Sequence, residues 1–172
     1  TADVTGCCIG IWGLKGVGKS LLCEKVVARL GSRFDAVVWR SLKRKPLLGD
    51  FCSGILQTLR NDAQTLAQGN DFSQVHESFQ AHESFQAIEQ LLSVMTEHSI
   101  LLIIENAESI LQPKTLAGDY LPGYLPYSEF FQAVAGSCSG ILLTGTEGPT
   151  DCVTQTGHHK NQHSIYLSGL SH

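Results

Sequence analysis

Gly13-Leu14-Lys15-Gly16-Val17-Gly18-Lys19-Ser20 decides the fold, because it satisfies the pattern G-x-x-x-x-G-K-[ST] at every fixed position. Before it, the apolar run 7–12 predicts a buried strand, and after it residues 21–30 have helical spacing and end at Gly31. Glycines allow successive backbone N–H groups to converge on an anion, and a helix N-terminus adds partial positive charge. The stretch therefore predicts a phosphate-binding loop, to which the alternative is an ordinary glycine turn.

The composition is that of a folded globular chain. Its 172 residues suit one domain, and 42% apolar with 16% charged residues excludes a disordered protein. The sequence has no apolar run of about 18 residues and no signal peptide, so we expect no membrane contact and a cytoplasmic location. The six cysteines form no C-x-x-C pair, which favours reduced thiols. Because the sequence opens with Thr1 and not Met, we expect a piece of a longer protein.

Charge is distributed unevenly along the chain. Residues 1–60 carry ten Lys/Arg and four Asp/Glu, a net charge of +6, whereas residues 61–172 carry two and twelve, a net charge of −10. The positive half contains the predicted loop, which suits an anionic ligand. The acidic half argues against nucleic acid as a partner.

Strand-like and helix-like segments alternate along the chain. Further strands are predicted at 34–42, 99–106, 140–144 and 164–167, and helices at 47–60 and 128–135. Another helix is expected to dock through Phe85, Ile88, Leu91, Leu92 and Met95. This order predicts an α/β, three-layer P-loop NTPase fold with a five-stranded, mostly parallel sheet and right-handed crossovers.

Three segments are expected to lie outside regular structure, and a fourth is a short duplication. Residues 61–74 and 145–163 are polar and irregular, and 112–127 forms a long loop of the kind that is usually functional or disordered. The hexapeptide 76–81 is repeated directly as 82–87, which we interpret as a tolerated insertion that lengthens the outer end of a helix.

Within the predicted loop, Lys19 would reach the β- and γ-phosphates of a nucleotide and Ser20 would ligate Mg²⁺. Glu105 ends an aliphatic strand, where ligands collect in parallel sheets, and is the second predicted Mg²⁺ ligand; its alternative role is to cap a helix. We assign catalytic roles to Glu105, Asn106 and Thr144. We assign nucleotide contacts to Gly13, Lys15, Gly16, Val17, Gly18, Lys19, Ser20 and Leu21.

Fast hydrolysis is not expected from this sequence. Asn106 follows the predicted metal ligand and cannot accept a proton at neutral pH. Glu108 is the nearest acidic alternative as a base, or else an exposed residue at a helix start. No arginine follows Arg60, so residues 61–172 cannot supply an arginine to the γ-phosphate.

The ordered motifs resemble the NB-ARC domain of STAND-class signalling ATPases, especially bacterial versions that carry WD40 or TPR repeats. The matching stretches are 13–20, 34–42, 101–111, 118–127, 141–144 and 165–170. Two positions differ from the family pattern: Glu105 replaces an aspartate, and Thr146 stands where a sensor arginine is expected.

The resemblance implies one P-loop domain over residues 1–172 that stops before the helical ARC subdomains. It also implies ADP bound at rest, exchange for ATP on activation, and oligomerisation of a multidomain protein with an effector and WD40- or TPR-type repeats. The strand ending at Thr144 would lie between those ending at Trp12 and Glu105. Two alternatives to a nucleotide switch remain open, a nucleotide-independent scaffold and a P-loop phosphotransferase. The sequence names neither the activating signal, nor the effector, nor the oligomer size.

Overall fold

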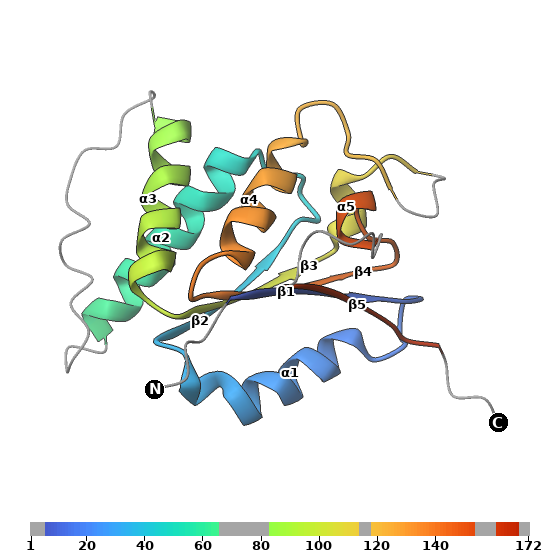
Figure 1. The fold of residues 1–172 in the computed structure, drawn as a ribbon, viewed down its shortest axis with the longest axis horizontal. Coiled ribbons are helices and arrows are strands. Elements are labelled where there is room, and N and C mark those ends of the chain that lie inside the picture. Colours follow the sequence, from blue (N-terminus) through green and yellow to red (C-terminus); the bar gives the residue numbers. More distant parts are fainter. Residues whose placement is uncertain (1–5, 66–82, 114–117, 154–160, 169–172) are drawn as a thin grey trace.

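In the computed structural model, the described residues are 6–65, 83–113, 118–153 and 161–168 (Figure 1). The strands are β1 (Cys7–Trp12), β2 (Ala36–Ser41), β3 (Ile100–Glu105), β4 (Gly140–Gly145) and β5 (Gln162–Tyr166). The α-helices are α1 (Lys19–Leu30), α2 (Leu48–Thr65), α3 (Glu83–Glu97), α4 (Pro126–Ala135) and α5 (Thr150–Val153). Two 3₁₀ helices, η1 (Gly31–Arg33) and η2 (Ala107–Ile110), complete the order.

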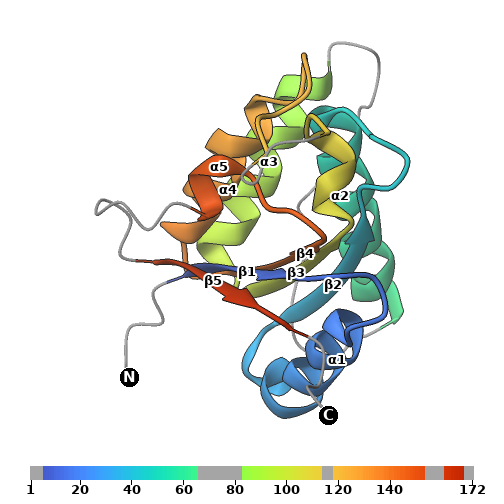
Figure 2. The same cartoon turned by 90° about the vertical axis from the view of Figure 1, so that its right-hand side faces the viewer.

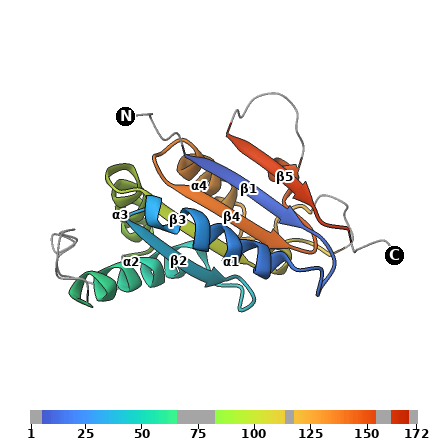
Figure 3. The ribbon, with the colours of Figure 1, turned by 90° about the horizontal axis from the view of Figure 1, so that it is seen from below.

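The five strands form one sheet in the order β2-β3-β4-β1-β5, seen from below in Figure 3. Every neighbouring pair is parallel. The α/β fold class and the parallel P-loop sheet are thereby confirmed. The position of β4 between β1 and β3, which the family resemblance implied, is also confirmed.

Helices cover the two faces of the sheet unequally. Helix α1 lies against one face, and α2, α3, α4 and α5 lie on the other (Figures 1 and 2). This follows from the strand order, because right-handed connections place the β1–β2 crossover opposite the later ones. Strand β3 lies between β2 and β4, and its residues Ile100–Ile104 are all buried, as its continuous aliphatic run predicts.

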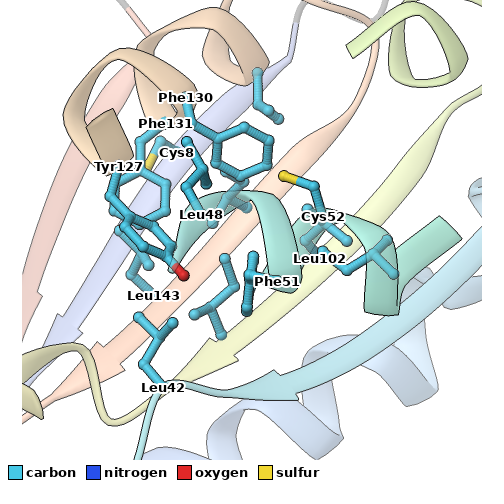
Figure 4. Close-up of a cluster of buried hydrophobic side chains, with 14 of the residues drawn as sticks. Cys8, Leu42, Leu48, Phe51, Cys52, Leu102, Tyr127, Phe130, Phe131 and Leu143 are labelled. Atoms are coloured by element: carbon cyan, nitrogen blue, oxygen red, sulfur yellow. The ribbon is translucent and has the colours of Figure 1, made fainter. Parts of the chain in front are cut away.

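The larger core lies between the sheet and helices α2, α3 and α4 (Figure 4). Helix α4 contributes Tyr127, Phe130 and Phe131, and the Tyr127 ring meets Phe51 of α2 edge-on at 5.6 Å. Although Tyr127 is fully buried, its hydroxyl donates a hydrogen bond to the carbonyl of Pro46 at 3.0 Å. Its polar end is thus satisfied, and the same bond fixes the start of α4 beside the loop after β2.

Some expectations about local structure were wrong. Phe85 is 82% exposed, whereas Ala87, Leu91 and Met95 are buried. The docked face of α3 follows an i, i+4 row, and Phe85 lies two residues, about 200°, from Ala87 on the opposite side. Helix α2 continues to Thr65 instead of ending at residue 60.

The two long irregular segments contain more structure than predicted. Helix α4 begins at Pro126, inside the expected loop 112–127, and Leu111 pairs with Tyr120 in an antiparallel bridge. Helix α5 lies inside the expected irregular segment 145–163. The first copy of the duplicated hexapeptide, 76–81, lies outside the described residues. None of the helices in the described part of the chain is long and apolar enough to cross a membrane.

Candidate nucleotide-binding site

The phosphate-binding loop joins β1 to α1 at the carboxyl end of the sheet, as the sequence predicts. Gly16 and Gly18 have φ angles of 82° and 99°, in the left-handed region that favours glycine. Nothing lies within 4 Å of a Cβ added at either position, so the loop borders open space. Side chains at these two positions would occupy this space, and their absence leaves room for a group such as a bound phosphate.

Lys19 reaches back over this loop from the first turn of α1. Its Nζ donates hydrogen bonds to the carbonyl oxygens of Gly13 at 2.7 Å and Leu14 at 2.9 Å. The ammonium group is consequently held inside the loop that would surround a phosphate. A phosphate oxygen entering the loop would meet this charge directly, which is the role predicted for the lysine.

Ser20 and Glu105, the two predicted metal ligands, are brought together by the fold. The Ser20 hydroxyl donates to Glu105 Oε1 at 2.5 Å, although the two residues are 85 positions apart. Ser20 lies in the first turn of α1, and Glu105 is the last residue of β3. A hydroxyl and a carboxylate beside a phosphate loop are oxygen donors of the kind that Mg²⁺ binds together with nucleotide phosphates.

The carboxylate of Glu105 also acts on the helix that follows the loop. Burial raises the pKa of the Cys23 thiol to about 11, and the negative charge of Glu105 is the next cause of this shift. Cys23 is fully buried on the sheet-facing side of α1. The negative charge of Glu105 therefore affects the ionisation of a side chain in the first turns of α1.

Asn106, the predicted catalytic neighbour of Glu105, adopts a left-handed backbone conformation with φ of 61°. Its side-chain Nδ2 donates to the Ser41 hydroxyl at 2.8 Å. Ser41 ends β2 in register with Glu105, and sequence reasoning missed it. The available signal was its place at the end of a parallel strand, where polar side chains gather at one sheet edge.

Thr144, the third predicted catalytic residue, is 3% exposed and pairs in register with Ile11 of β1. Residues in register on adjacent parallel strands face the same side of a sheet. Ile11 belongs to the smaller apolar cluster between the sheet and α1, whose buried residues are Ile11, Cys23, Leu101, Ile103 and Leu142. Thr144 thus lies on the face that also carries Glu105 and the loop-to-helix junction. The predicted contact of Thr144 with a γ-phosphate stays a prediction.

The remaining predicted nucleotide contacts line the outside of the loop. Lys15 is exposed, Val17 is half-buried, and Leu21 is 54% exposed on the first turn of α1. Their side chains therefore remain accessible, and their contacts to a nucleotide stay predictions.

The end of β4 and the segments after β3 and β4 hold the loop from the side. The N–H of Gly13 donates to the carbonyl of Gly145 at 3.2 Å, and the N–H of Thr146 donates to Glu108 Oε2 at 3.2 Å. Glu108, considered above as a base or an exposed helix start, is half-buried in η2 with one carboxylate oxygen engaged. Thr146, at the position of the expected sensor arginine, contributes its backbone to this network.

Known proteins are similar to this chain at three levels. The AAA domain family matches residues 4–120. An uncharacterized WD repeat-containing protein of Nostoc sp. is 27% identical over 172 residues, covering 94% of this chain and 13% of the relative. A chain in the solved structure of Drosophila ORC bound to DNA has a TM-score of 0.53 and 15% identity, covering 96% of this chain and 39% of that one. The last similarity concerns the fold alone.

The family match extends from just before β1 to the segment after η2. It therefore contains the phosphate-binding loop, Glu105, and the elements β1, α1 and β3 that carry them. Because this match covers well over half of the sequence, the chain belongs to the AAA domain family.

Proposed function

We propose that this domain binds ATP and ADP with Mg²⁺ and works as a conformational switch in a longer signalling protein. The observation that carries the proposal is the 2.5 Å contact between Ser20 and Glu105 beside the phosphate-binding loop. Hydroxyl and carboxylate come from separate elements, and the sheet order brings them together beside the loop, which supports a shared role in holding a nucleotide-bound metal.

Each group has a defined part in holding the nucleotide. The N–H groups of the loop would surround the phosphates, and Lys19 would exchange its carbonyl partners for phosphate oxygens. Ser20 and Glu105 would hold Mg²⁺, which neutralises phosphate charge. The shared hydrogen bond between them would then be replaced by metal contacts. Loops ordered by the γ-phosphate would transmit the bound state.

Slow hydrolysis is part of the proposal. The Asn106 amide donates to Ser41, and an amide cannot take a proton from water at neutral pH. Arg60 is the last arginine in the sequence, and the position after β4 holds Thr146. These observations support a site that retains its nucleotide rather than one that turns it over rapidly.

The wider setting is proposed from the family resemblance and the relative. The NB-ARC motifs favour a STAND-class protein with ARC, effector and WD40- or TPR-type domains, in which ATP promotes homo-oligomers. The similarity to a WD repeat-containing protein, of which this chain spans 13%, supports attached repeats. We propose a cytoplasmic location. We also propose that the domain binds no nucleic acid, because the charge of residues 61–172 is strongly negative.

The test compares Lys19→Ala with the parent and with Lys25→Ala, which removes an exposed lysine from the same helix. Binding is followed by the fluorescence of an N-methylanthraniloyl derivative of ADP or ATP, with and without Mg²⁺. We expect Lys19→Ala to weaken binding by a factor of about 10 or more, since it loses charge-assisted hydrogen bonds to phosphate. Lys25→Ala should bind like the parent.

A second measurement identifies any nucleotide released from the purified domain by heating. ADP would support the resting-switch proposal. Equal binding by Lys19→Ala and the parent would contradict it, and a parent that ignores Mg²⁺–ATP would favour the nucleotide-independent scaffold. A steady ATPase rate of about 1 s⁻¹ or more would favour the phosphotransferase alternative.

A further inference from the structure

A single peptide group connects the phosphate-binding loop to the residues after β3. The carbonyl of Gly145 accepts the N–H of Gly13 at 3.2 Å. The N–H of Thr146, which belongs to the same planar peptide group, donates to Glu108 Oε2 at 3.2 Å. Glu108 thus holds one end of a rigid unit, and the first residue of the loop is bound to the other end.

The space around this peptide is closed. A Cβ added to Gly145 would lie 2.8 Å from Glu108 Oε2 and 2.8 Å from the carbonyl oxygen of Glu147. On the other side of the loop, a Cβ added to Gly13 would lie 2.5 Å from the carbonyl oxygen of Leu167. The start of the loop is therefore packed closely between the ends of β4 and β5. The carboxylate of Glu108 packs against the end of β4.

The location of Glu108 adds a second connection. Its 3₁₀ helix follows directly after Glu105 and Asn106, so its backbone moves with the end of β3. A carboxylate that accepts the N–H of a peptide also polarises that peptide, which makes the carbonyl at its other end a better acceptor. One side chain consequently couples the strand that carries the metal-type carboxylate to the first residue of the phosphate loop.

We propose that Glu108 is a positioning residue of the nucleotide site, which fixes the start of the phosphate-binding loop through the Gly145–Thr146 peptide. The inference rests on the proposed nucleotide binding and assigns Glu108 no contact with the nucleotide. It differs from the role of a base, because what matters is a hydrogen-bond acceptor at the Oε2 position. The negative charge itself is secondary.

Three substitutions separate acceptor, length and charge. Glu108→Gln keeps an oxygen acceptor of the same reach and removes the charge, Glu108→Asp keeps the charge but is one methylene shorter, and Glu108→Ala removes both. Glu24→Gln and Glu24→Asp, at an exposed carboxylate of α1, are the matched controls. Each protein is titrated with the fluorescent ADP derivative in Mg²⁺, and its thermal midpoint is measured by circular dichroism.

We expect Glu108→Gln to bind within about twofold of the parent, and Glu108→Asp and Glu108→Ala to bind about fivefold more weakly or worse. The Glu24 variants should bind like the parent. If Glu108→Asp and Glu108→Ala bind normally while only their thermal midpoints fall, Glu108 merely stabilises the fold and the proposal is wrong. A loss in Glu108→Gln as large as in Glu108→Ala would overturn it in favour of a charge effect.

Failure of the two proposals can be told apart. A parent that binds no nucleotide removes the proposed function and this inference with it. A parent that binds, together with an Asp variant that binds equally well, removes the inference alone. Should Glu108→Ala fail to fold, the comparison of the Gln and Asp variants still decides the outcome.

Discussion

Replacing Gly10 by alanine should destabilise the domain through Trp12, the residue immediately before the phosphate-binding loop. Both residues face the larger core from β1, and the Trp12 ring lies over the glycine. A Cβ at position 10 would lie 2.2 Å from Cζ2 of the Trp12 indole and 2.5 Å from its Cε2. A methyl group therefore cannot be added unless the indole moves.

The size of the effect follows from this geometry. Two carbon atoms rest about 3.5 Å apart or more, so the indole must move by about 1.3 Å. Trp12 is fully buried, and overpacking a core of this kind costs about 1–3 kcal/mol. The move also breaks the hydrogen bond from Trp12 Nε1 to the Ser164 hydroxyl, 3.1 Å long, at about 1 kcal/mol. We expect a total loss of about 2–4 kcal/mol.

Urea unfolding, followed by circular dichroism and by tryptophan emission, measures this loss. With a slope of about 2 kcal/mol per molar urea, the midpoint should fall by about 1–2 M. Gly54→Ala is the matched control, because nothing lies within 4 Å of a Cβ added there and the residue is inside α2. Alanine in a helix interior should raise stability by about 0.5–1 kcal/mol. A Gly10→Ala midpoint equal to that of the parent would refute the reasoning.

Two further predictions concern Ser20, the proposed metal ligand, and the buried thiols. We expect Mg²⁺ to raise the affinity of the parent for ADP by about tenfold. Ser20→Ala should abolish this gain and leave binding without Mg²⁺ nearly unchanged. Titrations with and without the metal measure both affinities. Burial raises the pKa of the Cys52 thiol to about 12, and burial with Glu105 raises that of Cys23 to about 11, from 9.0. The unfolded chain therefore releases these protons first. The stability they contribute is complete below pH 9.0 and is lost as the pH rises through about 11 for Cys23 and about 12 for Cys52. The urea midpoint should fall between pH values of about 8 and about 10.5, and less steeply in Cys52→Ala; an equal fall in that variant would contradict the assignment.

Strand positions could be predicted from the sequence because their signals are local. The aliphatic run of β3 and the β-formers of β2 predict elements whose bounds agree with the structure to within two residues. Pairing of Ser20 with Glu105 was also predictable, since the loop motif and a carboxylate at a strand end have fixed places in a parallel sheet.

What failed depended on contacts between distant segments. Phe85 belongs to the apolar residues of α3, yet only the packing of α2 against that helix decides which face is buried. Ser41 and Glu108 acquire their roles from hydrogen bonds to Asn106 and Thr146, which lie 65 and 38 positions away in the sequence. Hydrogen bonds of this kind leave no periodic pattern. The strand-end position of Ser41 indicates a polar residue at the site edge, but it does not identify the partner.

The hydrogen bonds now present in the site have a consequence for how binding can act as a switch. Lys19 is bonded to the loop carbonyls and Ser20 to Glu105, so a nucleotide bound with Mg²⁺ as proposed would have to replace both sets of partners. Binding free energy is then a difference between two bonded arrangements, and it depends on how closely the end of β3 approaches α1. By linkage, any contact that moves this strand end changes nucleotide affinity, and the nucleotide changes that contact by the same free energy. Under the proposed function, the Ser20–Glu105 bond is the element through which an attached domain would affect nucleotide affinity.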